Sequence, residues 1–224
     1  MEPTLVSTYR RTVGASLARV WENVLDWEHL PWLHRETFRF VELLEQDADG
    51  WHVRTATHGA HAAEDIVLGV AVERAARRYH ARTLAGPGTG TDILTRLVSR
   101  GSHATDIEVE FHVPDVDPTR AAAVGARYVA LYTRLWDQDE AMIRRRQALL
   151  DGRLAASRRT VALDGAAVTF GTVCPHRGGP LDAVAVEDGC IACPWHGYRF
   201  DVRTGASADG RGLRLDGVSA LPRS

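Results

Sequence analysis

The chain has 224 residues, 45% of them hydrophobic and 25% charged, and a formal net charge of −2 at pH 7. This length suits one large or two modest domains, and interspersed arginines and acids exclude the basic footprint of a nucleic-acid-binding protein. No run approaches the roughly 18 apolar residues of a membrane span, and the N-terminus lacks a signal-peptide pattern. Three cysteines are too few for a disulfide framework, so we expect a cytoplasmic protein.

Alternating apolar and polar segments predict an antiparallel sheet in the first half of the chain. We expect strands at residues 5–13, 51–55, 66–72 and 107–113. The Gly86–Gly90 cluster predicts a turn within this sheet. After the first strand, residues 15–30 carry apolar side chains at helical spacing, which predicts a helix.

A set of metal-ligating side chains ends that helical segment. Glu22, Asp26 and His29 are spaced i, i+4 and i+7, which places them on one face of a helix. His34 follows His29 by five residues and would point elsewhere on a continuous helix. Pro31 removes an amide donor and disfavours helix at the preceding residue, so the chain can turn and the two imidazoles can converge.

A long helix is predicted after the last strand of the sheet. Asp117 and Pro118 supply an N-cap and an N1 proline. The helical pattern runs to about Leu150, and Gly152 lies just past its end.

The phase of this helix selects one acid among three. At about 100° per residue, Asp139 falls on a narrow stripe, Asp137 points to the opposite side and Glu140 lies well off it. The other members of the stripe are Tyr128, Tyr132, Leu135 and Met142. A buried carboxylate is costly unless it is paired or binds metal. We therefore predict that Asp139 is the carboxylate that would complete a three-residue ligand set with His29 and His34.

Two short loops near the C-terminus combine cysteine and histidine. Cys174-Pro-His176 and Cys193-Pro-Trp-His196 spell C-x-H, a 16-residue gap and C-x-x-H. Where both cysteines bind one iron and both histidines bind the other, the result is a [2Fe–2S] centre of raised potential. A zinc ribbon using Cys190 is the alternative, but C-x-H is not usual zinc spacing. Otherwise Cys190 is a small buried apolar residue.

The two loops, with their Gly-Gly-Pro turn and the Trp before the second His, resemble the Rieske [2Fe–2S] family. The order of elements in residues 1–151 resembles the START-like (SRPBCC) helix-grip fold, in which an antiparallel sheet wraps around a long C-terminal helix. The segment from Glu22 to His34 resembles the mononuclear-iron motif of Rieske non-haem iron oxygenases. In that family the catalytic domain is a helix-grip domain and the third ligand is an Asp on the final helix, which agrees with Asp139.

This resemblance implies an α+β chain with an inverted domain order. We expect a helix-grip catalytic domain at residues 1–151, a linker at 152–158 and a small all-β Rieske domain at 159–224. The resemblance also implies that Asp26 bridges iron ligand His29 and a Rieske ligand, His196, across neighbouring subunits of a homotrimer.

The function implied is oxygenation of an apolar small molecule, aromatic compounds included, as a mono- or dioxygenase. No G-x-G-x-x-G motif is present, so electrons must come from an external NAD(P)H-dependent reductase or a ferredoxin. Two other functions stay open. One is an electron carrier whose START-like domain binds a ligand or docks a partner, and the other is a ligand sensor with a redox switch.

Overall fold

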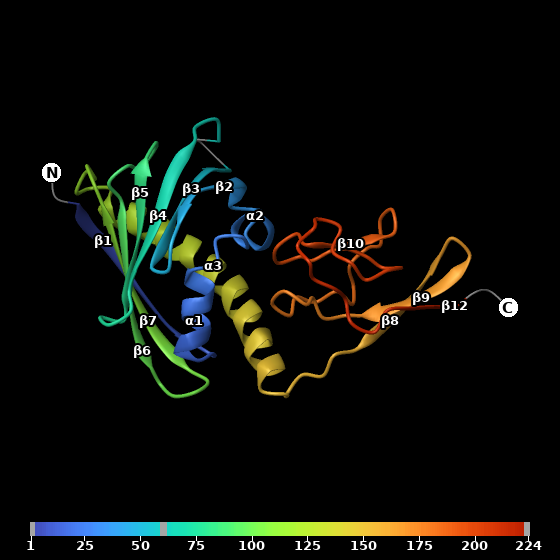
Figure 1. The fold of residues 1–224 in the computed structure, drawn as a ribbon. Helices are drawn as coiled ribbons and strands as arrows, with labels where there is room; N and C mark the ends of the chain where they lie inside the picture. The colour runs from blue at the N-terminus through green and yellow to red at the C-terminus, as the bar shows by residue number, and fades with distance from the viewer. Residues whose placement is uncertain (1–2, 59–61, 222–224) are drawn as a thin grey trace. The chain divides into compact units, whose positions relative to one another are not determined.

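The chain forms two compact units, residues 1–144 and 145–224, each described here by itself. A computed structural model describes residues 3–58 and 62–221 (Figure 1). The predicted linker at 152–158 falls within the second unit, and the predicted domain boundaries stay a prediction. Within the described residues, no helix combines the length and apolar character needed to cross a membrane.

The elements of the first unit are β1 (Thr4–Val13), α1 (Leu17–Val24), α2 (Leu30–Leu33), β2 (Phe38–Gln46), β3 (Gly50–Thr57), β4 (Ile66–Glu73), β5 (Arg78–Ala85), β6 (Asp92–Ser99), β7 (Thr105–Val113) and α3 (Ala121–Leu150), whose last turns enter the second unit. The second unit continues with β8 (Arg158–Leu163), β9 (Ala166–Gly171), β10 (Cys190–Ala192), β11 (Arg199–Asp201) and β12 (Ser219–Leu221).

The first unit is built on one seven-stranded antiparallel sheet. Its strand order is β1-β7-β6-β5-β4-β3-β2, so β2 to β7 form a meander and β1 pairs with the last strand. Strand β7 shows the predicted alternation, because Thr105, Ile107, Val109 and Phe111 are buried and the residues between them are not. Alternation of this kind places one face of the strand in the core.

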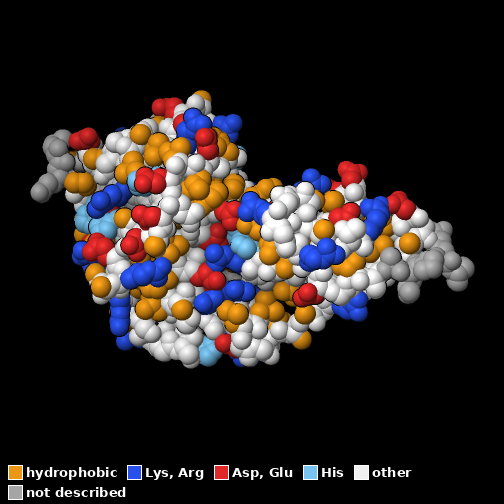
Figure 2. Space-filling view, in the orientation of Figure 1, with side chains coloured by type: hydrophobic (Ala, Val, Ile, Leu, Met, Phe, Trp, Pro, Cys, Tyr) orange, Lys and Arg blue, Asp and Glu red, His pale blue; other side chains and the backbone are white. Residues whose placement is uncertain are grey.

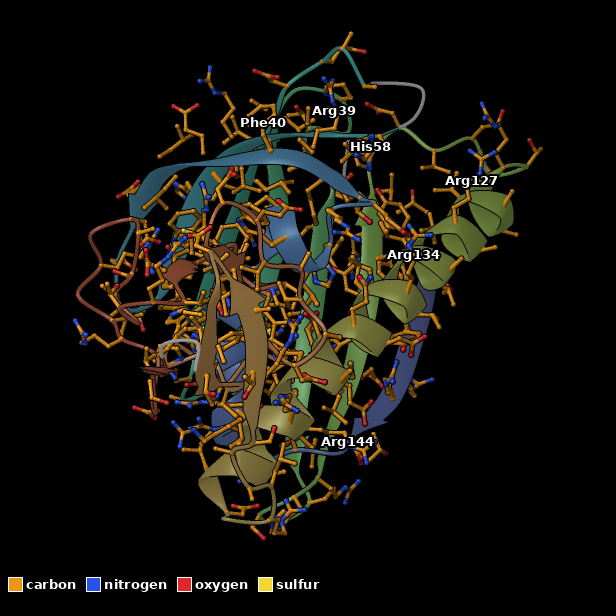
Figure 3. The ribbon with its side chains drawn as sticks, turned by 90° about the vertical axis from the view of Figure 1, so that its right-hand side faces the viewer. Arg39, Phe40, His58, Arg127, Arg134 and Arg144 are labelled. Atoms are coloured by element: carbon orange, nitrogen blue, oxygen red, sulfur yellow. The ribbon has the colours of Figure 1, made fainter. Side chains whose placement is uncertain are left out.

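Helix α3 packs against this sheet through aromatic side chains (Figure 1). The ring of Phe111 on β7 stacks on Tyr128 at 5.3 Å and meets Tyr132 edge-on at 4.9 Å. Figure 3 shows Arg127 and Arg134 on the outer side of the same helix, where both are exposed. The amphipathic pattern of the sequence therefore gives α3 one face for the sheet and one for solvent.

The long helix begins later than predicted but ends where predicted. Asp117 caps a turn instead, its carboxylate accepting from the amide of Thr119 at 2.8 Å, and α3 starts at Ala121. At the other end α3 stops at Leu150, and Gly152 takes a positive φ of 65°. A left-handed glycine just past the last turn is a common helix stop.

The region of α1 and α2 differs from the predicted single helix over residues 15–30. Helix α1 ends at Val24, so Asp26 and His29 lie beyond it and do not share a helix face with Glu22. Leu30 is helical, contrary to the prediction, because Pro31 lies in the first turn of α2. The first turn has amide donors without helical partners, so proline costs nothing there.

The second unit contains small sheets and loops, and after the last turns of α3 its strands are all antiparallel. Strands β8, β9 and β12 form a three-stranded sheet, and β10 pairs with β11. Phe170, Leu181 and Phe200 are fully buried within it. Figure 2 shows acidic and basic side chains interspersed on the visible surface, in keeping with the small net charge.

Candidate metal centres

Three predicted ligands meet inside the first unit. His29 and His34 stand at the two ends of the four-residue helix α2, as its N-cap and C-cap residues, and Asp139 projects from α3. One turn of helix therefore sets the spacing of the two imidazoles. All three side chains are buried, and their ligand atoms lie within 4.8 Å of one another.

The distances fit a group of donors around one small cation. Nε2 of His34 lies 3.0 Å from Oδ1 of Asp139, and Nε2 of His29 lies 3.4 Å from the same oxygen. The two rings are 5.0 Å apart between centroids and nearly perpendicular, at 75°. Two imidazoles and one carboxylate are the donor set of non-haem ferrous sites with open positions, so these residues fit a mononuclear iron.

The electrostatics of the group are those of two imidazoles around one carboxylate. Burial opposes ionisation of Asp139, but the neighbouring His34 and His29 outweigh it and hold the pKa of this carboxyl well below its usual range. Burial would also lower the pKa of His29, yet hydrogen bonding with Asp139 and Asp26 raises it to about 10. The carboxylate thus carries the negative charge that a cation at this position requires.

Asp26 lies in the segment between α1 and α2. Its side chain is buried, and its Oδ2 is 3.9 Å from Nδ1 of His29, on the far side of the ring from Asp139. The structure therefore places Asp26 beside the predicted iron ligand. The predicted contact with His196 across subunits stays a prediction.

The other two acids of α3 have structural partners. Asp137 has 61% of its side chain exposed and pairs with Arg11 at 2.6 Å. Glu140 also pairs with Arg11 and accepts from the amide of Gly14 at 2.9 Å. The helical phase that singled out Asp139 agrees with this arrangement.

The three candidate ligands lie on the wall of a cavity of about 330 Å³. Strands β2 to β6 supply most of its apolar lining, including Phe38, Trp51 and Ile93, and α3 supplies Leu131 and Leu135. Mostly apolar pockets with a few convergent polar groups are the usual sites of small ligands. The size and position of this cavity were not predictable from the sequence.

The two Cys/His loops of the second unit share one backbone pattern. In the first, the amide of Gly178 donates to the carbonyl of Cys174 at 2.9 Å, and the amide of Cys174 donates to Gly179 at 2.9 Å. In the second, Gly197 donates to Cys193 at 2.8 Å, and Cys193 donates to Tyr198 at 2.8 Å. Gly178 and Gly197 both have positive φ, 83° and 67°, which glycine adopts without strain.

These loops bring the four predicted cluster ligands together. Both thiols are buried and share a hydrogen bond, which is the largest influence lowering the pKa of Cys193, to about 5. The rings of His176 and His196 are 4.6 Å apart at an angle of 80°. A Cβ on Gly179 would lie 2.5 Å from Sγ of Cys193, so only glycine leaves room for that sulfur. Two paired thiols and two paired imidazoles fit the donor set of a [2Fe–2S] centre of this type.

Side chains beyond the ligands complete this site, and sequence reasoning missed them. Tyr198 stacks on His176 at 4.3 Å with an interplanar angle of 15°. The guanidinium of Arg211 lies 4.0 Å from the Tyr198 ring centroid. Two groups this close to one ring must occupy opposite faces, so the order is imidazole, phenol, guanidinium. Asp209 pairs with Arg211 at 3.2 Å and offsets part of its charge.

Cys190 lies on strand β10. Its backbone exchanges two hydrogen bonds with Glu187, at 2.9 and 2.8 Å. The residue is half-buried.

Comparison with known proteins agrees with the geometry of the second unit. The family model for the Rieske [2Fe-2S] domain matches residues 126–214. Both Cys/His loops lie within that match, so the chain contains a Rieske [2Fe–2S] domain, the iron–sulfur domain of electron-transfer proteins. No curated protein matches the chain.

Solved structures similar to this chain cover about 60% of it. The aromatase/cyclase Zhui from Streptomyces sp. R1128 is 18% identical, over 62% of this chain and 93% of its own, with a TM-score of 0.48. A START superfamily protein from Mycobacterium smegmatis is 17% identical, over 60% and 97%, with a TM-score of 0.48. Norcoclaurine synthase from Thalictrum flavum is 17% identical, over 61% and 84%, with a TM-score of 0.46. In this chain a seven-stranded antiparallel sheet and a long helix precede the Cys/His loops of the Rieske domain.

Proposed function

We propose that the chain is a Rieske-type oxygenase that oxidises an apolar small molecule at a mononuclear non-haem Fe(II). The observation that carries the proposal is the convergence of His29, His34 and Asp139 on the wall of an apolar cavity, in a chain with a Rieske domain. When bound, a [2Fe–2S] cluster supplies single electrons, and a ferrous ion on three protein ligands has open positions for dioxygen.

The lining of the cavity supports a substrate that is apolar and of modest size. Its apolar walls exclude water and favour an apolar body of modest size, beside the predicted ligands. Burial raises the pKa of Tyr79 and of Tyr132 above the usual value, so both phenols in the lining stay protonated. Their hydroxyl groups can donate hydrogen bonds that orient a substrate oxygen.

Asp26 is the residue proposed to couple the two kinds of centre. Its carboxylate approaches Nδ1 of His29 and leaves Nε2 for the iron. By the family resemblance, the same carboxylate would accept from His196 of a neighbouring subunit in a trimer. Asp26→Asn should keep the metal content of both centres and abolish electron transfer from the reduced cluster to the mononuclear iron. Full single-turnover activity in that variant would rule out the bridge.

Electrons are proposed to reach the Rieske domain from a separate protein. A family resemblance of this kind implies an NAD(P)H-dependent reductase, with or without a ferredoxin. The substrate stays defined only as a class, apolar and small enough for the cavity.

The alternative is an electron-transfer protein whose START-like domain only binds a ligand. It is supported by the distances of 3.0 and 3.4 Å from Asp139 to the two imidazoles, which also suit an ion pair held by a proton. In that case the cavity would bind a ligand without oxidising it.

Metal stoichiometry distinguishes the two functions. The oxygenase should contain about three iron and two sulfide per chain, and the carrier about two of each. His34→Ala and Asp139→Asn should each remove one iron and leave the [2Fe–2S] absorption unchanged. His103→Ala, in an exposed turn, is the matched control and should retain all three. Two iron in the unaltered protein after anaerobic reconstitution with Fe(II) would exclude the oxygenase.

A further inference from the structure

His34 is held at both of its ring nitrogens. Nδ1 lies 2.7 Å from Oε1 of Gln138, and Nε2 lies 3.0 Å from Oδ1 of Asp139. The two partners are consecutive residues of α3 and are separated from the histidine by more than a hundred positions, 104 and 105. The ring itself is 2% exposed. Two consecutive residues of α3 therefore contact both ring nitrogens of a buried imidazole.

The contact with Gln138 determines which nitrogen carries the proton. An amide oxygen only accepts hydrogen bonds, so Nδ1 of His34 is the donor and bears the hydrogen. In the neutral ring, Nε2 then carries a lone pair, directed at Asp139. A lone pair and a carboxylate oxygen 3.0 Å apart repel each other unless a cation lies between them. This tautomer is the one that a metal ion at the triad requires.

The two histidines differ in the distances from their ring nitrogens to the neighbouring polar groups. His29 has a carboxylate oxygen of Asp26 at 3.9 Å from Nδ1 and that of Asp139 at 3.4 Å from Nε2. Both distances are longer than the corresponding ones at His34. The contacts of His34 with Gln138 and Asp139 are therefore the shorter ones.

We propose that Gln138 is a positioning residue that fixes the tautomer and orientation of His34 for metal binding. This inference rests on the proposed mononuclear site and adds a residue that neither the motif nor the helical phase indicated. Outer hydrogen-bond partners of metal-binding histidines typically change metal affinity by about 10- to 100-fold. Gln138 reaches the site through His34 and is not a metal ligand.

Co(II) binding tests the role without any turnover. Protein with an intact [2Fe–2S] cluster and a mononuclear site emptied by a mild chelator is titrated with Co(II) by calorimetry. Gln138→Leu keeps a similar volume but cannot accept the hydrogen bond, and it should weaken Co(II) binding by about 10- to 100-fold. Gln138→Glu retains an acceptor and should restore binding to within a few-fold of the unaltered protein. Gln147→Leu, which removes another α3 glutamine whose side-chain amide donates to Asp151 at 2.9 Å, should bind Co(II) normally.

A second readout reports the tautomer directly. In ¹⁵N-edited NMR of the metal-free, oxidised protein, His34 should show a protonated Nδ1, and Gln138→Leu should show a mixture of tautomers. Equal Co(II) affinity of the Leu variant and the unaltered protein would overturn the role of Gln138 and leave the iron site standing. Failure of the unaltered protein to bind Co(II) would overturn both. A normal thermal midpoint and cluster absorption in the Leu variant separate a local loss from misfolding.

Discussion

Gly125 lies buried on α3 against strand β1, and replacing it tests how closely the helix and the sheet approach. A Cβ at this position would lie 2.3 Å from the carbonyl oxygen of Val6 and 2.9 Å from Cβ of Ser7. Non-bonded carbon and oxygen atoms in proteins approach without strain only to about 3.3 Å. Gly125→Ala therefore requires α3 and β1 to separate by about 1 Å. The obstructing oxygen belongs to the backbone, so a rotamer change cannot relieve the contact.

Two opposing effects set the expected magnitude for Gly125. At an exposed helical position, Gly→Ala stabilises by about 1 kcal/mol, because alanine is the better helix former. Overpacking a tight site costs about 1–3 kcal/mol of stability. Because the atom in contact here belongs to the rigid backbone, we expect a cost at or above the upper end of this range. The net expectation is a loss of about 2 kcal/mol. Thr133→Ala, exposed on the same helix, should instead stabilise by about 0.5 kcal/mol.

Urea unfolding followed by tryptophan fluorescence measures this difference. Trp21, Trp51 and Trp136 are buried in the first unit and report on its packing. The midpoint should fall for Gly125→Ala and rise slightly for Thr133→Ala. Midpoints are compared instead of extrapolated free energies, because a chain of two units need not unfold in one step. A Gly125→Ala protein as stable as the Thr133→Ala control would refute the close approach of α3 to β1.

Three further substitutions, two of them paired with a control variant, have defined outcomes. Gly179→Ala places a methyl group against Sγ of Cys193, and iron and sulfide analysis should show a large loss of the [2Fe–2S] cluster; a fully loaded variant contradicts the tight fit. Arg211→Leu removes a cation 4.0 Å from the ring that stacks on a cluster ligand, so an EPR-monitored titration should give a lower reduction potential, whereas Arg211→Lys should change it less. Glu140→Gln should destabilise the first unit by about 1.5 kcal/mol in urea, because it weakens a charged hydrogen-bond network. Asp137→Asn, 61% exposed, should cost less than about 0.5 kcal/mol, and equal losses would argue against the assigned partners.

Two predictions that depended on local periodicity agree with the structure. The position of Asp139 follows from helical phase, because α3 is regular over 30 residues and its angle per residue does not drift enough to exchange faces. The strand from Ile107 to Val113 follows from two-residue alternation in the same way. The Cys/His loops are recognisable because their spacing reflects a fixed backbone geometry.

Features that depended on long-range contacts were not predictable. The contact between His34 and Gln138 spans 104 positions, and no sequence pattern relates two such residues. The apolar spacing over residues 15–30 predicted a continuous helix, yet α1 stops at Val24 and α2 comprises only four residues. Helices this short depend on tertiary packing for their stability. The predicted helix face was therefore wrong, although Asp26 and His29 still lie beside each other at the site.

The matching backbone pattern of the two Cys/His loops has a consequence for what orients the four proposed ligands. Each loop is closed by its own amide–carbonyl bonds, at 2.8 to 2.9 Å. Fixing a residue in one backbone conformation costs about 1–2 kcal/mol, and these bonds offset part of that cost for residues around all four proposed ligands. The hydrogen bonds of the polypeptide therefore contribute to the geometry in which the two thiols and two imidazoles are presented.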